Sequence, residues 1–202
     1  MKIGPKYKIA RRLKSPVFEK TQTQKFVLSE SKKSRPVRRR KNITDYGRQL
    51  LEKQKARYSY LLTEKQFSRY IFEAMARKDK KNADALFENL ESRLDNVVLR
   101  LGLAPTRPSA RQMVSHGHIF VNSRKMTIPS YRVSINDVIS VKERSLSKGV
   151  TIGLEERLKE VTVPVWISLD AAKKEGVIKK KPVLEGVDLL FDIQSVLEFY
   201  SR

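Results

Sequence analysis

The fold of this chain is decided by residues 91–141, which read ESRLDNVVLRLGLAPTRPSARQMVSHGHIFVNSRKMTIPSYRVSINDVISV. Apolar residues recur there at i, i+3, i+4 and i+7, which predicts a helix that is capped by Ser92 and ends at Gly102. Thr106 is the expected N-cap of a second helix, which ends at Gly117. Two short helices are therefore expected at the start of this segment.

The second part of the segment predicts short strands. Ile119 and Val121 alternate with polar or aromatic neighbours, and residues 122–125 are typical of a polar turn. Further short strands are expected near residues 125–128, 131–133 and 138–141. The fold class expected is α+β, with two short helices packed on short antiparallel strands in a module over residues 92–152.

The chain before the module divides into two parts. Residues 1–43 combine three prolines with basic runs and show no sustained apolar period, which predicts a basic extended N-terminal arm. Residues 44–91 are typical of a small helical domain, with Thr44 as an N-cap, a joint near Thr63 and another helix from Asn82. Aromatic side chains of that domain are expected to fill its core rather than to stack on bases.

The chain after the module predicts a β-rich C-terminal extension over residues 153–189. Residues 161–167 are rich in β-branched side chains, and Pro164 among them favours an edge strand. A short helix is expected from Asp170 to Gly176. A final helix over about residues 190–202 is expected to pack back on the helical domain.

The charge balance predicts a polyanionic partner. The 202 residues carry 43 Lys plus Arg against 22 Asp plus Glu, for a formal charge of +21, and residues 1–90 hold 25 basic and 9 acidic residues of that total. No stretch approaches the ~18 apolar residues of a spanning helix, so no membrane partner is expected. For the basic residues 1–43, a transit peptide or a disordered solubilising tail stays open as an alternative to a phosphate-binding arm.

Basic side chains recur at positions of the module that are expected to face outward. A guanidinium can bond two phosphate oxygens at once, so such a set predicts a phosphate-binding surface. These side chains are Arg93, Arg100, Arg107, Arg111, His118 and Lys125. Further basic candidates in the arm and the helical domain are Arg38, Arg39, Arg40, Lys41, Arg48, Lys53 and Arg57.

Two patterns suggest catalysis or metal binding but have simpler explanations. His116-Gly117-His118 has no third ligand nearby, and the chain has no cysteine, so no metal site is expected. Arg93-Leu94-Asp95 is similar to part of the catalytic motif of pseudouridine synthases, yet Asp95 lies in the first turn of a helix, where a carboxylate favours the dipole. No catalytic residue and no cofactor is assigned.

Several motifs of the chain resemble those of a known family. SRLDNVVLRLG, ARQMVSHGHIFVN, IPSYRV and DVI resemble the RNA-binding module named after the fourth protein of the small ribosomal subunit, the S-four family. YGRQLLEKQKARY (46–58), EKQFSRY (64–70) and EFYSR (198–202) are similar to the bacterial form of that ribosomal protein itself. Many family members bind zinc through N-terminal cysteines, so this chain is expected to be a zinc-free form.

The resemblance implies a structural constituent of the small ribosomal subunit that binds 16S rRNA and nucleates assembly of the subunit body. It also implies contact with the fifth small-subunit protein, where translational accuracy is affected, with other small-subunit proteins, and with mRNA near the channel through which it enters. It implies a cytoplasmic ribosome, bacterial rather than organellar. By matching residues, it places RNA contacts at Ser92, Arg93, Arg107, Ser109, Arg111, Gln112, His116, Gly117, His118 and Asn122.

Two other classes of protein carry such a module. RNA-modifying and tRNA-charging enzymes append it to a catalytic domain, but the flanks here lack a glycine-rich cofactor loop, a nucleotide-binding signature and paired carboxylates. A small heat-shock protein that rescues stalled large subunits would not require the arm or the matching C-terminus. The chain is therefore not expected to be an enzyme.

Overall fold

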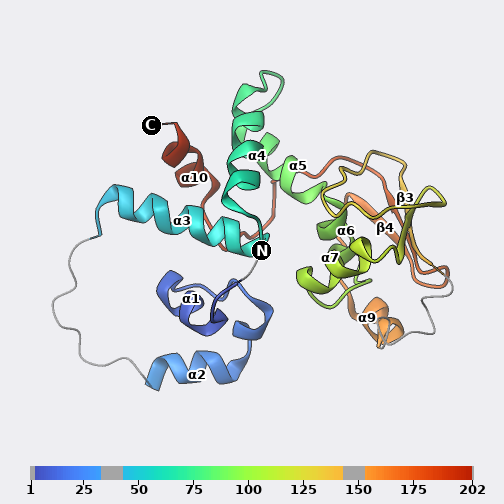
Figure 1. Ribbon diagram of the computed structural model, residues 1–202, viewed down its shortest axis with the longest axis horizontal. Coiled ribbons are helices and arrows are strands. Elements are labelled where there is room, and N and C mark those ends of the chain that lie inside the picture. The colour runs from blue at the N-terminus through green and yellow to red at the C-terminus, as the bar shows by residue number, and fades with distance from the viewer. Residues whose placement is uncertain (1–2, 33–42, 143–152, 202) are drawn as a thin grey trace. The chain divides into compact units, whose positions relative to one another are not determined.

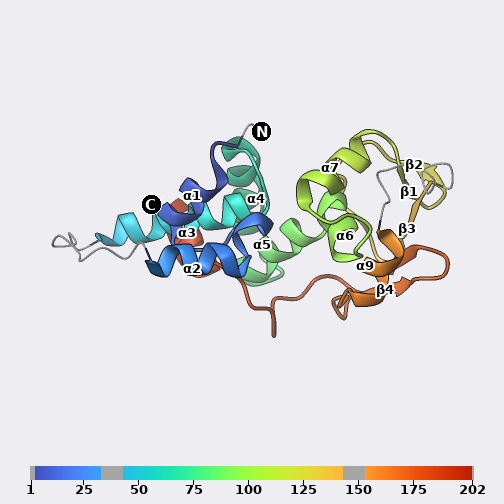
Figure 2. The same cartoon turned by 90° about the horizontal axis from the view of Figure 1, so that it is seen from below.

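The computed structural model describes residues 3–32, 43–142 and 153–201. The chain forms two compact units: one contains residues up to Ala83 together with those from Gly186 onward, and the other contains residues 84–185. The first unit is helical, and the second combines helices with an antiparallel sheet (Figure 1 and Figure 2). The α+β class expected from the sequence is confirmed.

The helical unit is built around α3 (Asp45–Ser59), α4 (Glu64–Ala76) and α10 (Ile193–Tyr200). Thr44 caps α3 as expected, and Thr63, where a joint was expected, caps α4. The hydroxyl oxygen of each accepts a hydrogen bond from the backbone N–H three residues later. The last helix, α10, packs against α3 and α4.

Aromatic side chains form much of the core of this unit, as expected. Phe67 and Tyr70 of α4 are fully buried. Tyr60 lies edge-to-face with Phe191, with ring centroids 6.3 Å apart, and Phe67 lies edge-to-face with Tyr200 at 6.4 Å. These contacts join the end of α3 and the start of α4 to the C-terminal segment, which is distant in the sequence.

The expectation of an extended arm is wrong for the described residues near the N-terminus. They form α1 (Lys6–Leu13), the 3₁₀ turn η1 (Glu19–Thr21) and α2 (Gln24–Lys32). The physical reason is a small apolar cluster that is completed by side chains distant in sequence, among them Leu61. Its buried members are Ala10, Leu13, Val17, Phe18, Phe26 and Leu61.

The second unit begins in α5 (Asn82–Glu91), followed by α6 (Leu94–Arg100) and α7 (Arg107–Ser115). Thr106 caps α7 as expected, since its hydroxyl oxygen accepts from the N–H of Ser109 at 3.3 Å. Gly102 and Gly117 follow α6 and α7 with φ of +72°, a left-handed conformation that ends a helix.

The expected cap of α6 is wrong, because Arg93 rather than Ser92 occupies the N-cap position. Ser92 lies in the turn that directly follows α5, where its N–H donates to the carbonyl of Glu88. The first N–H groups of α6, on Leu94 and Asp95, donate to backbone carbonyls of a neighbouring loop, on Tyr131 and Pro129. Tertiary contacts therefore replace the side-chain cap.

The sheet is five-stranded and antiparallel, with the order β2-β1-β3-β5-β4. Its strands are β1 (Ile119–Val121), β2 (Arg124–Lys125), β3 (Val138–Val141), β4 (Ile167–Asp170) and β5 (Glu175–Ile178). Asn122 and Ser123 connect β1 to β2 with φ of +50° and +63°, the left-handed pair of a tight hairpin turn. Residues 131–133, expected to be a strand, contribute an isolated bridge between Arg132 and Arg93.

The C-terminal part of this unit differs from the expected pattern. Of residues 161–167, only the last, Ile167, belongs to β4. The segment 170–176, expected to be a helix, instead contains the end of β4, a turn at residues 171–174 and the start of β5. Asp170 causes that turn, because its Oδ1 accepts from the backbone N–H groups of Ala172 and Lys173 at 3.1 Å. A helix that was not anticipated, α9 (Leu154–Glu160), contributes Leu154 and Leu158 to the core.

One hydrophobic core lies where α6 and α7 pack on the sheet. Its buried side chains include Leu94, Val97 and Val98 of α6, Met113 of α7 and Ile119 of β1. Because α6 and α7 each bury one face in this core, their remaining polar side chains meet along the line where the helices touch. Within the described ranges, no helix has both the length and the apolar character needed to cross a bilayer.

Candidate RNA interface

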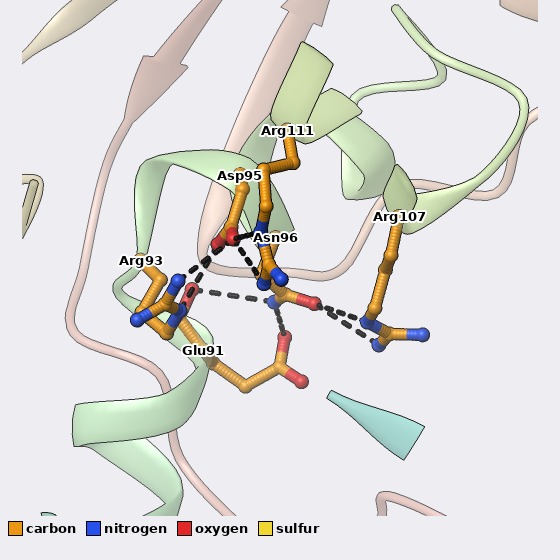
Figure 3. Close-up of polar contacts among 6 residues, drawn as sticks. All are labelled: Glu91, Arg93, Asp95, Asn96, Arg107 and Arg111. Atoms are coloured by element: carbon orange, nitrogen blue, oxygen red, sulfur yellow. Dashed lines mark hydrogen bonds and ion pairs between the residues drawn. The ribbon is translucent and has the colours of Figure 1, made fainter. Parts of the chain in front are cut away.

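Arginines at the start of α7 lie one turn apart, as their spacing of four residues predicts. Arg107 and Arg111 both extend toward α6, where each guanidinium is bonded to an acceptor (Figure 3). Arg111 donates through Nη2 and Nε to Asp95 Oδ2 at 2.7 and 3.0 Å. Its side chain keeps 29% of its surface exposed. Arg107 and Arg111 are therefore anchored to the scaffold while they still reach the surface.

Asp95 joins Arg111 to a second arginine of the same unit. Arg93 donates through Nε to Oδ1 at 3.0 Å and through Nη2 to Oδ2 at 2.7 Å. The side chain of Arg93 is only 2% exposed, so the expectation that it faces outward is wrong. The backbone at this N-cap is extended, with φ −72° and ψ 135°, so the direction of the Arg93 side chain does not follow the helical spacing of α6. The structure thus gives Asp95 a role in the scaffold, as expected, rather than a catalytic one.

Asn96, beside Asp95 on α6, connects Arg107 to a buried carboxylate. Its Oδ1 accepts from Arg107 Nε and Nη2 at 3.2 and 3.0 Å, and its Nδ2 donates to Glu91 Oε2 at 2.7 Å (Figure 3). Arg100 forms a two-point pair with Glu91, both bonds being 2.9 Å. The side chain of Arg100 is partly exposed, and it pairs with the same Glu91 carboxylate that orients Asn96.

The remaining candidates of the module differ in exposure. Gln112, His116 and Lys125 are exposed, while Ser109 and His118 are half-buried. Gly117 is buried, and an added Cβ would collide with the side chain of Lys125, so the glycine lets that side chain lie across the turn. The ring centroids of His116 and His118 lie 6.1 Å apart. In the described ranges, no group of three His, Cys, Asp or Glu side chains could hold a metal ion.

Two candidates, Ser92 and Asn122, form hydrogen bonds that stabilise the fold. Ser92 is buried, and its carbonyl accepts from the N–H of Val133. Asn122 donates through Nδ2 to Asp137 Oδ1 at 2.8 Å, and its Oδ1 accepts from the N–H of Val138 at 2.9 Å. Ser92 thus joins the start of α6 to the loop at residues 131–133, and Asn122 joins the end of β1 to the start of β3.

The basic candidates of the helical unit have mixed positions. Arg48 is exposed, but Lys53 is 9% exposed, which contradicts the sequence-based expectation that its side chain lies on an exposed helix face and is a candidate for RNA contact. Lys53 Nζ lies 2.6 Å from Glu64 Oε1 and 4.7 Å from the centroid of the Phe199 ring. Arg57 is also largely buried, 3.7 Å from Glu64. The candidates Arg38, Arg39, Arg40 and Lys41 lie outside the described residues.

Sequence reasoning identified the arginines but missed the residues that orient them. Glu91, Asp95 and Asn96 carry the acceptors, and all are almost completely buried. The SRLDN motif contains two of these residues, but the pairing of Asn96 with Arg107 depends on how α7 packs against α6. No local signal specifies that packing.

The fold and this face define the chain as an RNA-binding protein built on an S4-type module. Residues 92–139 match the family model described as S4 domain, and residues 1–91 match that described as Ribosomal protein S4/S9 N-terminal domain. The chain belongs to the family of the small ribosomal subunit protein uS4. Members of this family are structural, non-enzymatic components of the ribosome, so the expectation that the chain is not an enzyme is confirmed.

Individual relatives are similar over most or all of the chain. Each is named small ribosomal subunit protein uS4. That of Herpetosiphon aurantiacus is 48% identical over 166 residues, covering 81% of this chain and 78% of the relative. That of Roseiflexus castenholzii is 43% identical over 206 residues, and that of Aquifex aeolicus is 40% identical over 211 residues, each covering 99% of this chain and 98% of the relative. The chain contains no cysteine and is therefore a form without zinc-binding cysteines.

Proposed function

We propose that this chain is a structural constituent of the small ribosomal subunit and that it binds 16S rRNA through the α7 face. This face is defined by Arg107, Arg111, Gln112 and His116. The observation that carries the proposal is the anchoring of two arginines, one turn apart, to acceptors on α6 while Arg111 stays partly exposed. Guanidinium groups held in this way can bond phosphate oxygens in a defined geometry.

Around this face, further candidates extend the proposed contact surface. The proposed surface also includes Lys125, His118, Asn122 and Ser109 of the module, and Gly117 lets Lys125 lie across the turn. Arg100 is partly exposed on α6. Arg48 would add phosphate attraction from the helical unit, and the basic residues 38–41 would add more. The excess of basic residues supports this electrostatic contribution.

Membership in the uS4 family supports a finer proposal about the role of the chain. As a primary rRNA-binding protein it would nucleate assembly of the subunit body. With the fifth small-subunit protein it would affect translational accuracy, near the channel through which mRNA enters. The relatives named above come from bacteria, which supports a bacterial cytoplasmic ribosome.

Fractionation of ribosomes after a high-salt wash tests the assignment to a subunit. We expect one copy of the chain on each small subunit and none on the large subunit. Presence on large subunits alone would instead favour a factor that rescues stalled large subunits.

The variant Arg111→Ala tests the proposed face. We expect it to weaken binding to a small-subunit rRNA transcript by about 1–3 kcal/mol. Arg77→Ala is a matched control, because Arg77 is 28% exposed and pairs with Asp79 through the same two kinds of bond. Equal losses in both variants would mean that only net charge matters and would rule out the α7 face.

A salt titration of the same complex tests the electrostatic part of the proposal. The logarithm of the binding constant should fall linearly with the logarithm of salt concentration, by about 0.7–0.9 for each phosphate contact. A binding constant that does not respond to salt would contradict the proposal.

A further inference from the structure

We propose that Asn96 is a positioning residue for RNA binding, which holds the guanidinium of Arg107 in its binding orientation through a relay from Glu91. This inference rests on the proposed function, since it concerns the same α7 face. It adds a residue that is 2% exposed and therefore does not itself reach the surface.

The relay has a defined direction because a carboxylate can only accept hydrogen bonds. Glu91 Oε2 accepts from Asn96 Nδ2 at 2.7 Å, which turns the amide so that its Oδ1 faces α7. Oδ1 then accepts from both Nε and Nη2 of Arg107, at 3.2 and 3.0 Å. Two bonds to one oxygen fix the plane of the guanidinium as well as its position (Figure 3).

Glu91 is itself held in place from the other side. Arg100 donates to both carboxylate oxygens at 2.9 Å, and the side chain of Glu91 is 1% exposed. Because this ion pair anchors Glu91 independently of Asn96, removal of the amide leaves the carboxylate with a cationic partner. Loss of Asn96 should therefore remove its two bonds from Arg107 without leaving the Glu91 carboxylate unpaired.

The chemistry of the acceptor also distinguishes Arg107 from its neighbour on α7. Arg111 is held by Asp95, whose negative charge offsets part of the attraction to a phosphate. Arg107 bonds instead to a neutral amide, which orients the guanidinium through two hydrogen bonds to Oδ1 without placing a negative charge at that acceptor. Side-chain ordering opposes binding, so an arginine already ordered in the free protein binds more tightly.

A double-mutant cycle with Asn96→Ala and Arg107→Ala tests this relay. The full chain is bound to a small-subunit rRNA transcript, with an unrelated RNA of equal length as the control. We expect Asn96→Ala to weaken binding roughly 2- to 12-fold and to have less than about a 2-fold effect when Arg107 is already alanine. Although Asn96 is neutral, its loss should also reduce the salt slope, which is the slope of the logarithm of the binding constant against the logarithm of salt concentration. The expected reduction is up to about the contribution of one phosphate contact.

Two further variants separate positioning from a loss of stability. Val98→Ala truncates a buried side chain on the same helix without touching Arg107, and it should lower stability but leave RNA affinity unchanged. Asn96→Ser, which is shorter and keeps a polar group, replaces Asn96→Ala if that variant does not fold. Urea unfolding of every variant accompanies the binding measurements.

The outcomes distinguish this inference from the proposed function. If the wild-type chain does not prefer small-subunit rRNA, the proposed function fails, and the inference fails with it. If the wild-type chain does prefer it, the inference alone is overturned by any of three results: an unchanged salt slope in Asn96→Ala, an undiminished effect of Asn96→Ala in the Arg107→Ala background, or an equal loss of affinity in Val98→Ala.

Discussion

Two arginine–aspartate pairs in this chain have the same geometry in different surroundings. In both Arg77–Asp79 and Arg93–Asp95, Nε lies 3.0 Å from Oδ1 and Nη2 lies 2.7 Å from Oδ2. The side chain of Asp79 is 57% exposed, whereas that of Asp95 is 5% exposed. Water can solvate either partner of the first pair if the other is lost, but it cannot reach the second.

This contrast predicts that the same substitution changes stability by very different amounts at the two positions. Asp95→Asn should lower the free energy of unfolding by about 3–5 kcal/mol, because it leaves the buried charge of Arg93 without its carboxylate. Asp79→Asn should have little effect. Urea unfolding followed by the fluorescence of Trp166 measures the first change, since this only tryptophan lies in the same core as α6. Circular dichroism measures the control, and similar losses in both variants would contradict the role of burial.

At the scale of elements, α6 and α7 start in different ways although both have cap residues nearby. The first N–H groups of α6 bond to carbonyls of a loop, whereas α7 starts from the hydroxyl of Thr106. The beginning of α6 therefore depends on tertiary structure, and that of α7 depends on a local contact. Since Arg107 follows Thr106 directly, this cap also supports the candidate RNA interface.

We expect Thr106→Ala to lower the free energy of unfolding of this unit by about 0.5–2 kcal/mol, because an N–H at the start of α7 loses its acceptor. Thr127→Ala removes the same atoms from an exposed position and should change stability little. Trp166 fluorescence during urea unfolding compares the two. Equal stability of both variants would show that the Thr106 hydroxyl does not stabilise α7.

Another element, α10, is tied to α3 and α4 through one carboxylate. Glu64 Oε1 accepts from Lys53 Nζ and from the hydroxyl of Tyr200, both at 2.6 Å. Burial opposes ionisation of Glu64, but these bonds and the charges of Lys53 and Arg57 outweigh it and lower its pKa below the usual 4.5. Burial and the adjacent Glu64 raise the pKa of Tyr200, so its hydroxyl stays protonated and keeps donating.

The lowered pKa of Glu64 predicts how stability changes with pH. The unfolded chain binds a proton at this site at a higher pH than the folded chain does, so the stabilisation is present above about pH 4.5 and is lost as pH falls through the folded pKa. Urea unfolding from pH 6 to pH 3 should show a larger loss for the wild type than for Glu64→Gln. Glu73→Gln, which alters an exposed pair with Arg69 on the same helix, should keep the wild-type response.

At the scale of the whole molecule, the chain leaves the helical unit at Ala83 and returns to it at Gly186. Residues 84–185 are continuous and contain both the S4-type core and the candidate RNA interface. The helical unit instead needs two distant segments, since Phe191 and Tyr200 pack on Tyr60 and Phe67. The two units should therefore respond differently to truncation.

We expect a chain that ends at residue 185 to lose stability in the helical unit only. The urea transition followed by Trp166 fluorescence should stay close to that of the full chain, because Trp166 lies within residues 84–185. The transition followed by circular dichroism should shift to lower urea or broaden. A matching shift in the fluorescence transition would contradict the independence of the two units.

Some features of this protein follow from interactions within a few residues and could be predicted from the sequence. Thr44, Thr63 and Thr106 each bond to an N–H three residues ahead, and Gly102 and Gly117 end helices by their own conformation. The positions of α3, α4, α7 and α10 therefore agreed with their local patterns. The family motifs of the module extended this agreement to its class.

Other features depend on partners that no local pattern specifies. The helices α1 and α2 are stabilised in a cluster that includes Leu61, and Lys53 is buried because α10 brings Phe199 over it. Arg93 and Arg111 share Asp95 only because α7 packs against α6, and the same packing makes Asn96 the acceptor for Arg107. The residue types of the candidate RNA interface could thus be read from the sequence, while burial and pairing through tertiary packing determine which of them reach the surface.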